Sequence, residues 1–278
     1  MYERSTTNDA SVYGAGTSTS YEQANAQIDT GSSAFLGKVY GYMAILLAIT
    51  FAVAFGVGYG LYYGVYNAID AGNTELAGNL LYIGVSGMIV SAIAMFICAM
   101  IISVASVRRQ MSIVVPGIIY AVSFGVTLSF LTLVANEVEP WIIPSAFAIT
   151  GLVFAIMFLI TRKARNLHWL GMLGLTILTG ALMLGMVFFV VYLLNSVIGL
   201  NFMSSSAYLL FVAIDAVIFF AMILLITYDI WKITKIAEHG MYSKNLAQYC
   251  AFWLYQDFMY LLIRIIRILL VIAIHSKK

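Results

Sequence analysis

The sequence predicts an all-α membrane protein, a bundle of seven transmembrane helices with the seventh helix at its centre. Hydrophobic residues make up 63% of the 278 residues and charged residues only 9%, against about 25% charged in a soluble domain. The apolar residues gather in seven long segments, and about 20 helical residues suffice to cross a hydrocarbon core. The seventh segment also contains Asp257, Arg264 and Arg267. Charges are costly in lipid, so they favour a place inside the bundle.

The chain begins with a polar tail over residues 1–34, rich in Ser, Thr, Asn, Gln and Gly. Such a composition cannot bury enough apolar area to fold alone, so we predict a disordered tail followed by a transmembrane domain over residues 35–278. The predicted spans are Leu36–Gly60, Leu81–Ser103, Ile113–Ala135, Trp141–Ile160, Trp169–Leu194, Tyr208–Tyr228 and Cys250–Ile274.

The loop charges predict the orientation of these spans. The loops after the second, fourth and sixth segments are basic, the loops after the first and third are acidic, and the loop after the fifth is uncharged. By the positive-inside rule the basic loops and the N-terminal tail are cytoplasmic. Seven crossings would place Lys277 and Lys278 outside. Either the seventh segment crosses despite them, or it is re-entrant and the C-terminus returns to the cytoplasm.

Composition also bounds the partners. The formal net charge of +2 is too small to indicate a nucleic-acid partner. The three histidines and two cysteines are scattered without metal-ligand spacing, so we expect no cofactor. The expected partners are the lipid bilayer and the ions that cross it.

Two acids carry the functional argument. Asp229 directly follows the sixth predicted segment, and Asp257 lies about two turns into the seventh. Both would lie near the cytoplasmic side, where they can face each other. Two close carboxylates cannot both ionise cheaply, so they would share a proton and act as a pH-dependent latch. Their oxygens are also ligands that Ca²⁺ prefers. The alternative is a permanently protonated, structural pair.

Asp229 also requires a counter-ion, because a carboxylate at a helix C-terminus meets the negative end of the helix dipole. Arg108 and Arg109 end the second segment on the same side of the membrane. One of them could hold Asp229 and keep a pore shut, and protonating the acid would weaken that latch. The alternative is that both arginines only anchor the helix at the cytoplasmic surface.

Three further acids suggest an ion path. Asp215 precedes Asp229 by about 21 Å of helix on nearly the same face, and Glu137 and Glu139 lie at the predicted outer mouth. The alternatives are a water-bathed residue at the end of a span and an ordinary solvated loop. Arg264 lies two turns past Asp257, so we do not expect these two to pair. Arg264 and Arg267 could instead reach an interface or bond to helix carbonyls.

The motifs resemble those of the Bax inhibitor-1 family, the transmembrane Bax inhibitor motif proteins. The similarity covers about residues 35–275. The matching stretches are Thr227-Tyr228-Asp229-Ile230, Leu254-Tyr255-Gln256-Asp257-Phe258 with Arg267, and Arg108-Arg109 before Ser123-Phe124-Gly125-Val126-Thr127-Leu128.

The resemblance implies a pH-sensitive calcium leak, with calcium as the transported ion. It carries the proton-sharing pair onto Asp229 and Asp257, and the latching arginine onto Arg108 or Arg109. Gln256, Tyr260 and Arg264 depart from the usual family pattern. The compact form resembles bacterial members, which favours the plasma membrane over the endoplasmic reticulum.

Other functions remain open at this point. The acid pair fits a proton-coupled calcium exchanger as well as a leak, and the tail could dock a regulatory partner. Intramembrane aspartyl proteases also use Tyr-Asp in one span and Asp in the next. However, their Gly-x-Gly-Asp and Pro-Ala-Leu motifs do not occur in this sequence, so we expect no enzymatic activity.

Overall fold

The computed structural model describes the backbone of residues 12–108, 112–163, 166–198, 205–240 and 243–276, and the side chains of 31–105, 112–161, 166–186, 213–240 and 243–274. Within these residues the chain forms seven α-helices and no strand, which confirms the all-α prediction. The helices are α1 (Val12–Asp70), α2 (Thr74–Arg108), α3 (Val114–Val138), α4 (Ile142–Lys163), α5 (His168–Ile198), α6 (Ser205–Glu238) and α7 (Lys244–Ser276).

Apolar side chains cover both the inside and the outside of the bundle. Ile83, Val90 and Phe96 on α2 are more than half exposed, as are Met172 and Met183 on α5. A helix that is apolar all round fits a lipid environment. Among the described residues six helices are long and apolar enough to cross a membrane. These spans are Gly31–Asp70, Thr74–Ala105, Val114–Val138, Ile142–Thr161, His168–Met186 and Ala213–Glu238.

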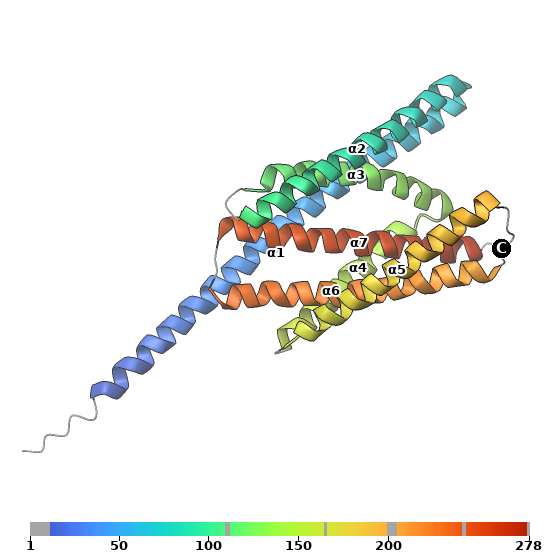
Figure 1. Ribbon diagram of the computed structural model, residues 1–278. Helices are drawn as coiled ribbons and strands as arrows, with labels where there is room; N and C mark the ends of the chain where they lie inside the picture. The colour runs from blue at the N-terminus through green and yellow to red at the C-terminus, as the bar shows by residue number, and fades with distance from the viewer. Residues whose placement is uncertain (1–11, 109–111, 164–165, 199–204, 241–242, 277–278) are drawn as a thin grey trace, which may run out of the picture.

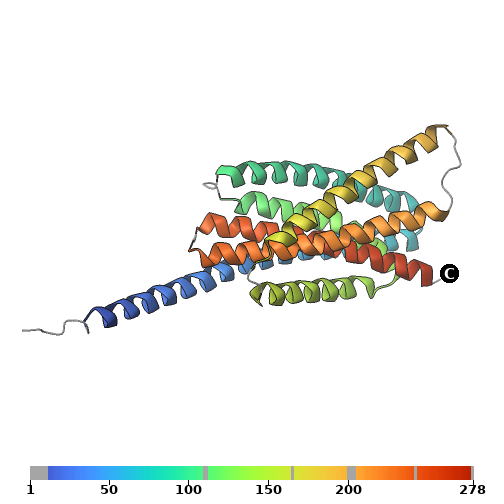
Figure 2. The same ribbon diagram turned by 60° about the horizontal axis from the view of Figure 1, so that its bottom comes forward.

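Helix α7 is not among these six, since it carries Asp257, Arg264 and Arg267 within about three turns. It nevertheless contributes much of the buried core. The fully buried large side chains of α7 are Tyr249, Leu254, Tyr255, Met259, Leu261, Leu262 and Ile266. It contacts α1, α3, α4 and α6 and passes between these helices in both views (Figures 1 and 2).

The helices are longer than the spans that we predicted from the apolar segments. Helix α1 runs back to Val12, inside the tail for which we predicted disorder, and its N-terminal part extends beyond the other helices (Figure 1). The first buried side chain along the described chain is Phe35, at the predicted start of the transmembrane domain. Residues 1–11 of the predicted tail lie outside the described residues.

The turn between α1 and α2 shows how one helix ends and the next begins. Gly72 has φ +73°, a conformation that glycine adopts without steric cost. The amides of Gly72 and Asn73 donate to the carbonyls of Ile69 and Ala68, at 2.9 Å each, which closes α1 in a Schellman motif. The Asn73 side chain then accepts the amide of Leu76 at 3.0 Å and caps α2.

Candidate functional site

The two predicted acids lie within helices rather than at their ends. Helix α6 continues past Asp229 for more than two turns to Glu238, and α7 begins more than three turns before Asp257. The helix dipole acts mainly within the last turn. The expectation that Asp229 ends a helix and meets its dipole is therefore wrong, because Trp231 to Ala237 continue the helix beyond the apolar segment.

The two acids lie on α6 and α7, which contact each other. The charge of Asp229 acts on Asp257, and the charge of Lys232, about one turn later on α6, acts on Asp229. The Oδ2 atom of Asp257 is buried and has no hydrogen-bond partner among the described residues. A buried carboxyl oxygen without a partner is costly, so this position favours a bound proton or cation.

A cation lies on the same seam. The Lys232 ammonium sits 5.4 Å from the centroid of the Trp253 ring on α7, within the range of a cation–π interaction. Lys232 thereby links α6 to α7 near the acid pair. Lys232 is therefore a cationic neighbour of the Asp229 carboxylate. From the sequence we predicted only Arg108 or Arg109 as its counter-ion.

An apolar cavity lies beside the residues that follow the two acids. Ile230 and Phe258, which directly follow the two acids, line a cavity of about 410 Å³. The cavity is completed by residues of α1, α4 and α7, namely Tyr40, Met43, Gly151, Phe154, Ala155, Phe158 and Leu254.

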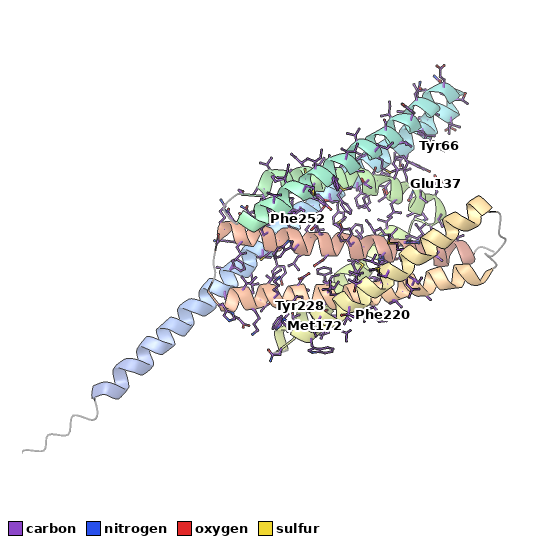
Figure 3. The ribbon with its side chains drawn as sticks, viewed as in Figure 1. Tyr66, Glu137, Met172, Phe220, Tyr228 and Phe252 are labelled. Atoms are coloured by element: carbon purple, nitrogen blue, oxygen red, sulfur yellow. The ribbon has the colours of Figure 1, made fainter. Side chains whose placement is uncertain are left out.

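Tyr228, which precedes Asp229, is wedged against α5. A Cβ atom at Gly171 would lie 2.6 Å from Tyr228 Cγ, so only glycine lets the two helices approach this closely. The Tyr228 ring also makes an edge contact with the His168 ring at 6.1 Å. Figure 3 labels Tyr228 of α6 and Met172, the residue that follows Gly171 on α5. The Tyr-Asp dipeptide therefore has a fixed rotation on α6.

A buried hydrogen-bond group holds α7 just before Asp257. The hydroxyls of Thr50 on α1 and Tyr255 on α7 lie 2.7 Å apart, and Thr50 donates to the carbonyls of Leu46 and Ala121 at 3.0 and 3.1 Å. Thr50 and Tyr255 are fully buried. One hydroxyl thus joins α1, α3 and α7, a role that an isolated Thr in an apolar segment did not reveal.

Two glutamines of α7 make further polar contacts. Gln256, which departs from the family pattern, donates to the Tyr120 hydroxyl at 3.4 Å. Gln248 accepts the Ser112 hydroxyl at 3.0 Å and the Ile113 amide at 3.2 Å. Gln248 thereby fastens the start of α3 to α7. In the sequence, each glutamine is recognisable only as a polar side chain among apolar neighbours. The residues that it contacts are remote in sequence, so the sequence did not indicate them.

The predicted ion-path residues do not form one cluster. Asp215 is ion-paired with Arg264, and Arg267 Nη1 lies 3.6 Å from Asp215 Oδ1. Glu137 is exposed near the end of α3 and lines a cavity between α1, α2 and α3, and Glu139 follows α3 directly. Arg264 also donates to the Asp215 carbonyl at 3.3 Å, which is the carbonyl bonding that we considered for it.

The latch and the metal site stay predictions. Arg108 is the last residue of α2, but its side chain lies outside the described residues, and Arg109 lies outside them entirely. Among the described residues no three His, Cys, Asp or Glu side chains gather to hold a metal ion. The pair Asp229 and Asp257 therefore offers a calcium ion carboxylates from two residues only.

The comparisons with known proteins identify the family. The family model "Inhibitor of apoptosis-promoting Bax1" matches residues 32–273. No curated protein and no solved structure matches the chain. The match covers most of the chain, including Asp229, Asp257 and the helices that hold them, and so the chain belongs to the Bax inhibitor-1 family of membrane proteins.

Proposed function

We propose that the protein is a pH-sensitive calcium leak channel in which Asp229 and Asp257 share a proton and gate a pore near the cytoplasmic side. The observation that carries the proposal is the acid pair. The two carboxyl groups lie on neighbouring helices, the charge of Asp229 acts on Asp257, and Asp257 has a buried oxygen without a described partner. Family membership supports a role in the membrane rather than enzymatic chemistry.

The proposed topology has seven crossings with α7 at the centre. Its unbroken 33 residues measure about 50 Å, long enough to cross a bilayer without re-entry. Contacts of α7 with α1, α3, α4 and α6 support the central place. With the basic loops inside, the N-terminus is cytoplasmic and the acid pair lies nearer that side. The proposed location is a bacterial plasma membrane.

The proposed gate follows from the charge balance at the pair. At a pH above the range in which the pair takes up its proton, Asp229 is ionised. Lys232 and an arginine at the end of α2 then hold the Asp229 carboxylate, and these contacts keep α6 in place. Below that range, a proton neutralises the acid and the latch loses its Coulomb attraction. Acidification on the cytoplasmic side therefore opens the pore, and calcium flux rises as the pH falls.

Calcium flux into proteoliposomes across a pH series tests this function. The wild type should show a flux that rises on acidification, whereas Asp229→Asn and Asp257→Asn should lose this pH response. Glu238→Gln is the matched control, because this acid also lies on α6 but is exposed and should leave the pH response unchanged. An unchanged response in both Asp variants would refute the gate. Uphill calcium accumulation driven by a proton gradient would replace the leak with exchange.

A further inference from the structure

A second group of charges lies on the α6–α7 seam, away from the acid pair. The Arg264 guanidinium on α7 donates to the Asp215 carboxylate on α6 and to the Asp215 carbonyl at 3.3 Å. Arg267 adds a longer contact of 3.6 Å to the same carboxylate oxygen. Both side chains of the Asp215–Arg264 pair are only 22% exposed, whereas Arg267 is 67% exposed. Together these residues form what we call the outer charge cluster.

The outer charge cluster lies at a different level of the seam from the acid pair. Asp215 precedes Asp229 by about 21 Å along α6, and Arg264 follows Asp257 by about 10 Å along α7. Helix α6 has no other charged residue between Asp215 and Asp229, and α7 has none between Asp257 and Arg264. The same two helices therefore carry two separate charged groups, one acidic and one mixed.

The charge balance of the two groups is opposite. The acid pair combines two carboxyl groups with the nearby Lys232 ammonium, whereas the outer charge cluster combines one carboxylate with two guanidinium groups. Arg264 occupies the Asp215 carboxylate that a cation would need, and Arg267 leaves an excess positive charge beside it. A partly buried pair of this kind is costly to break on one side only, because the remaining charge stays unpaired.

We propose that Asp215, Arg264 and Arg267 form a cation-selectivity barrier on the α6–α7 seam. This inference rests on the proposed leak function. While Arg264 holds Asp215, the cluster repels divalent cations at this level and limits their rate of passage. Without Arg264, Asp215 keeps only the longer 3.6 Å contact to the mostly exposed Arg267, and its carboxylate becomes available to calcium. Asp215 is thus a masked cation site, and Arg264 is the residue that masks it.

Two neutralising variants test the barrier through the initial rate of calcium flux in proteoliposomes. Arg264→Gln removes one positive charge, leaves Asp215 with only the longer Arg267 contact and should raise the rate, whereas Asp215→Asn leaves two unpaired arginines and should lower it. Each change should be about tenfold, the effect of one unit charge on a divalent ion roughly 6 Å away in water-like surroundings. The charge-swapped double variant, Asp215→Arg with Arg264→Asp, keeps both the pair and its net charge and should restore a rate near wild type.

A barrier predicts that the two single variants change the calcium flux in opposite directions, whereas a merely structural pair does not. If the pair only holds the helices together, both single variants lower the melting temperature and shift the flux in the same direction. That outcome, or an unchanged flux in both, overturns the barrier.

The barrier and the leak fail differently. Loss of the pH response in the Asp229 and Asp257 variants combined with unchanged flux in Arg264→Gln and Asp215→Asn supports the leak and overturns the barrier. If the wild type passes no calcium at any pH but the Arg264→Gln variant does, the barrier is supported and the pH gate is refuted. If neither the wild type nor any variant passes calcium, both the leak and the barrier are overturned.

Discussion

Substituting Gly125→Ala tests the packing that places the acid pair. Gly125 lies on α3 where this helix meets α1, and an added Cβ would lie 2.7 Å from the Thr50 carbonyl oxygen and 2.8 Å from Val53 Cβ. Ordinary contact begins at 3.4 Å, so the shortfall at the oxygen is 0.7 Å. Because the oxygen belongs to the backbone, it cannot move aside as a flexible side chain can, and α1 must shift away from α3.

The expected loss of unfolding free energy can be taken from other cores into which an extra methyl group was inserted. Inserting a methyl group into a well-packed core costs about 1–3 kcal/mol, and about 1 kcal/mol lowers the melting temperature of a chain of this size by roughly 2–4 °C. We therefore expect Gly125→Ala to melt about 5 °C below wild type. The shift also displaces Thr50 and weakens its hydrogen bond to Tyr255, so the pH response of the flux should change as well.

Gly117→Ala is the matched control on the same helix. A Cβ there would lie 3.8 Å from Leu46 and 3.9 Å from Phe252, which is ordinary contact, and alanine is favoured over glycine in a helix by about 0.5–1 kcal/mol. Its melting temperature, measured by thermal unfolding in detergent, should equal or exceed that of wild type. An equal loss of melting temperature in both variants would show that the close approach at Gly125 has no specific effect on stability.

Two further predictions concern the hydrogen bonds of α7. Tyr255→Phe removes the 2.7 Å bond to Thr50 and should cost about 1 kcal/mol of unfolding free energy; stability equal to wild type in a denaturant titration would contradict it. Gln248→Ala leaves the Ser112 hydroxyl and the Ile113 amide without their acceptor and should cost about 1–3 kcal/mol. Gln248→Glu keeps an acceptor oxygen and should lose less, so a larger loss than in the Ala variant would refute this role.

The sequence predicted the helical class and the order of the helices because long apolar segments have few structural alternatives in lipid. It did not predict the helix ends. Hydropathy falls where the membrane ends, whereas the backbone hydrogen bonds continue through polar residues. Helix α6 accordingly extends beyond Tyr228 to Glu238, and α1 extends beyond Gly60 to Asp70.

The candidate site was predictable only in part. The sequence predicted one acid on each of two neighbouring helices, α6 and α7, and their pairing stays a prediction. The pairing of Arg264 with Asp215 depends on how α6 and α7 are rotated against each other, and no local pattern encodes that rotation. The contact of Thr50 with Tyr255 likewise joins residues that are remote in sequence.

The central claim is that Asp229 and Asp257 gate calcium by sharing a proton. The most direct measurement is calcium flux into proteoliposomes across a pH series, wild type against Asp229→Asn and Asp257→Asn. We expect a wild-type flux that rises as the pH falls and a flux in each variant that no longer follows pH. A variant flux that keeps the wild-type size and pH dependence would contradict it.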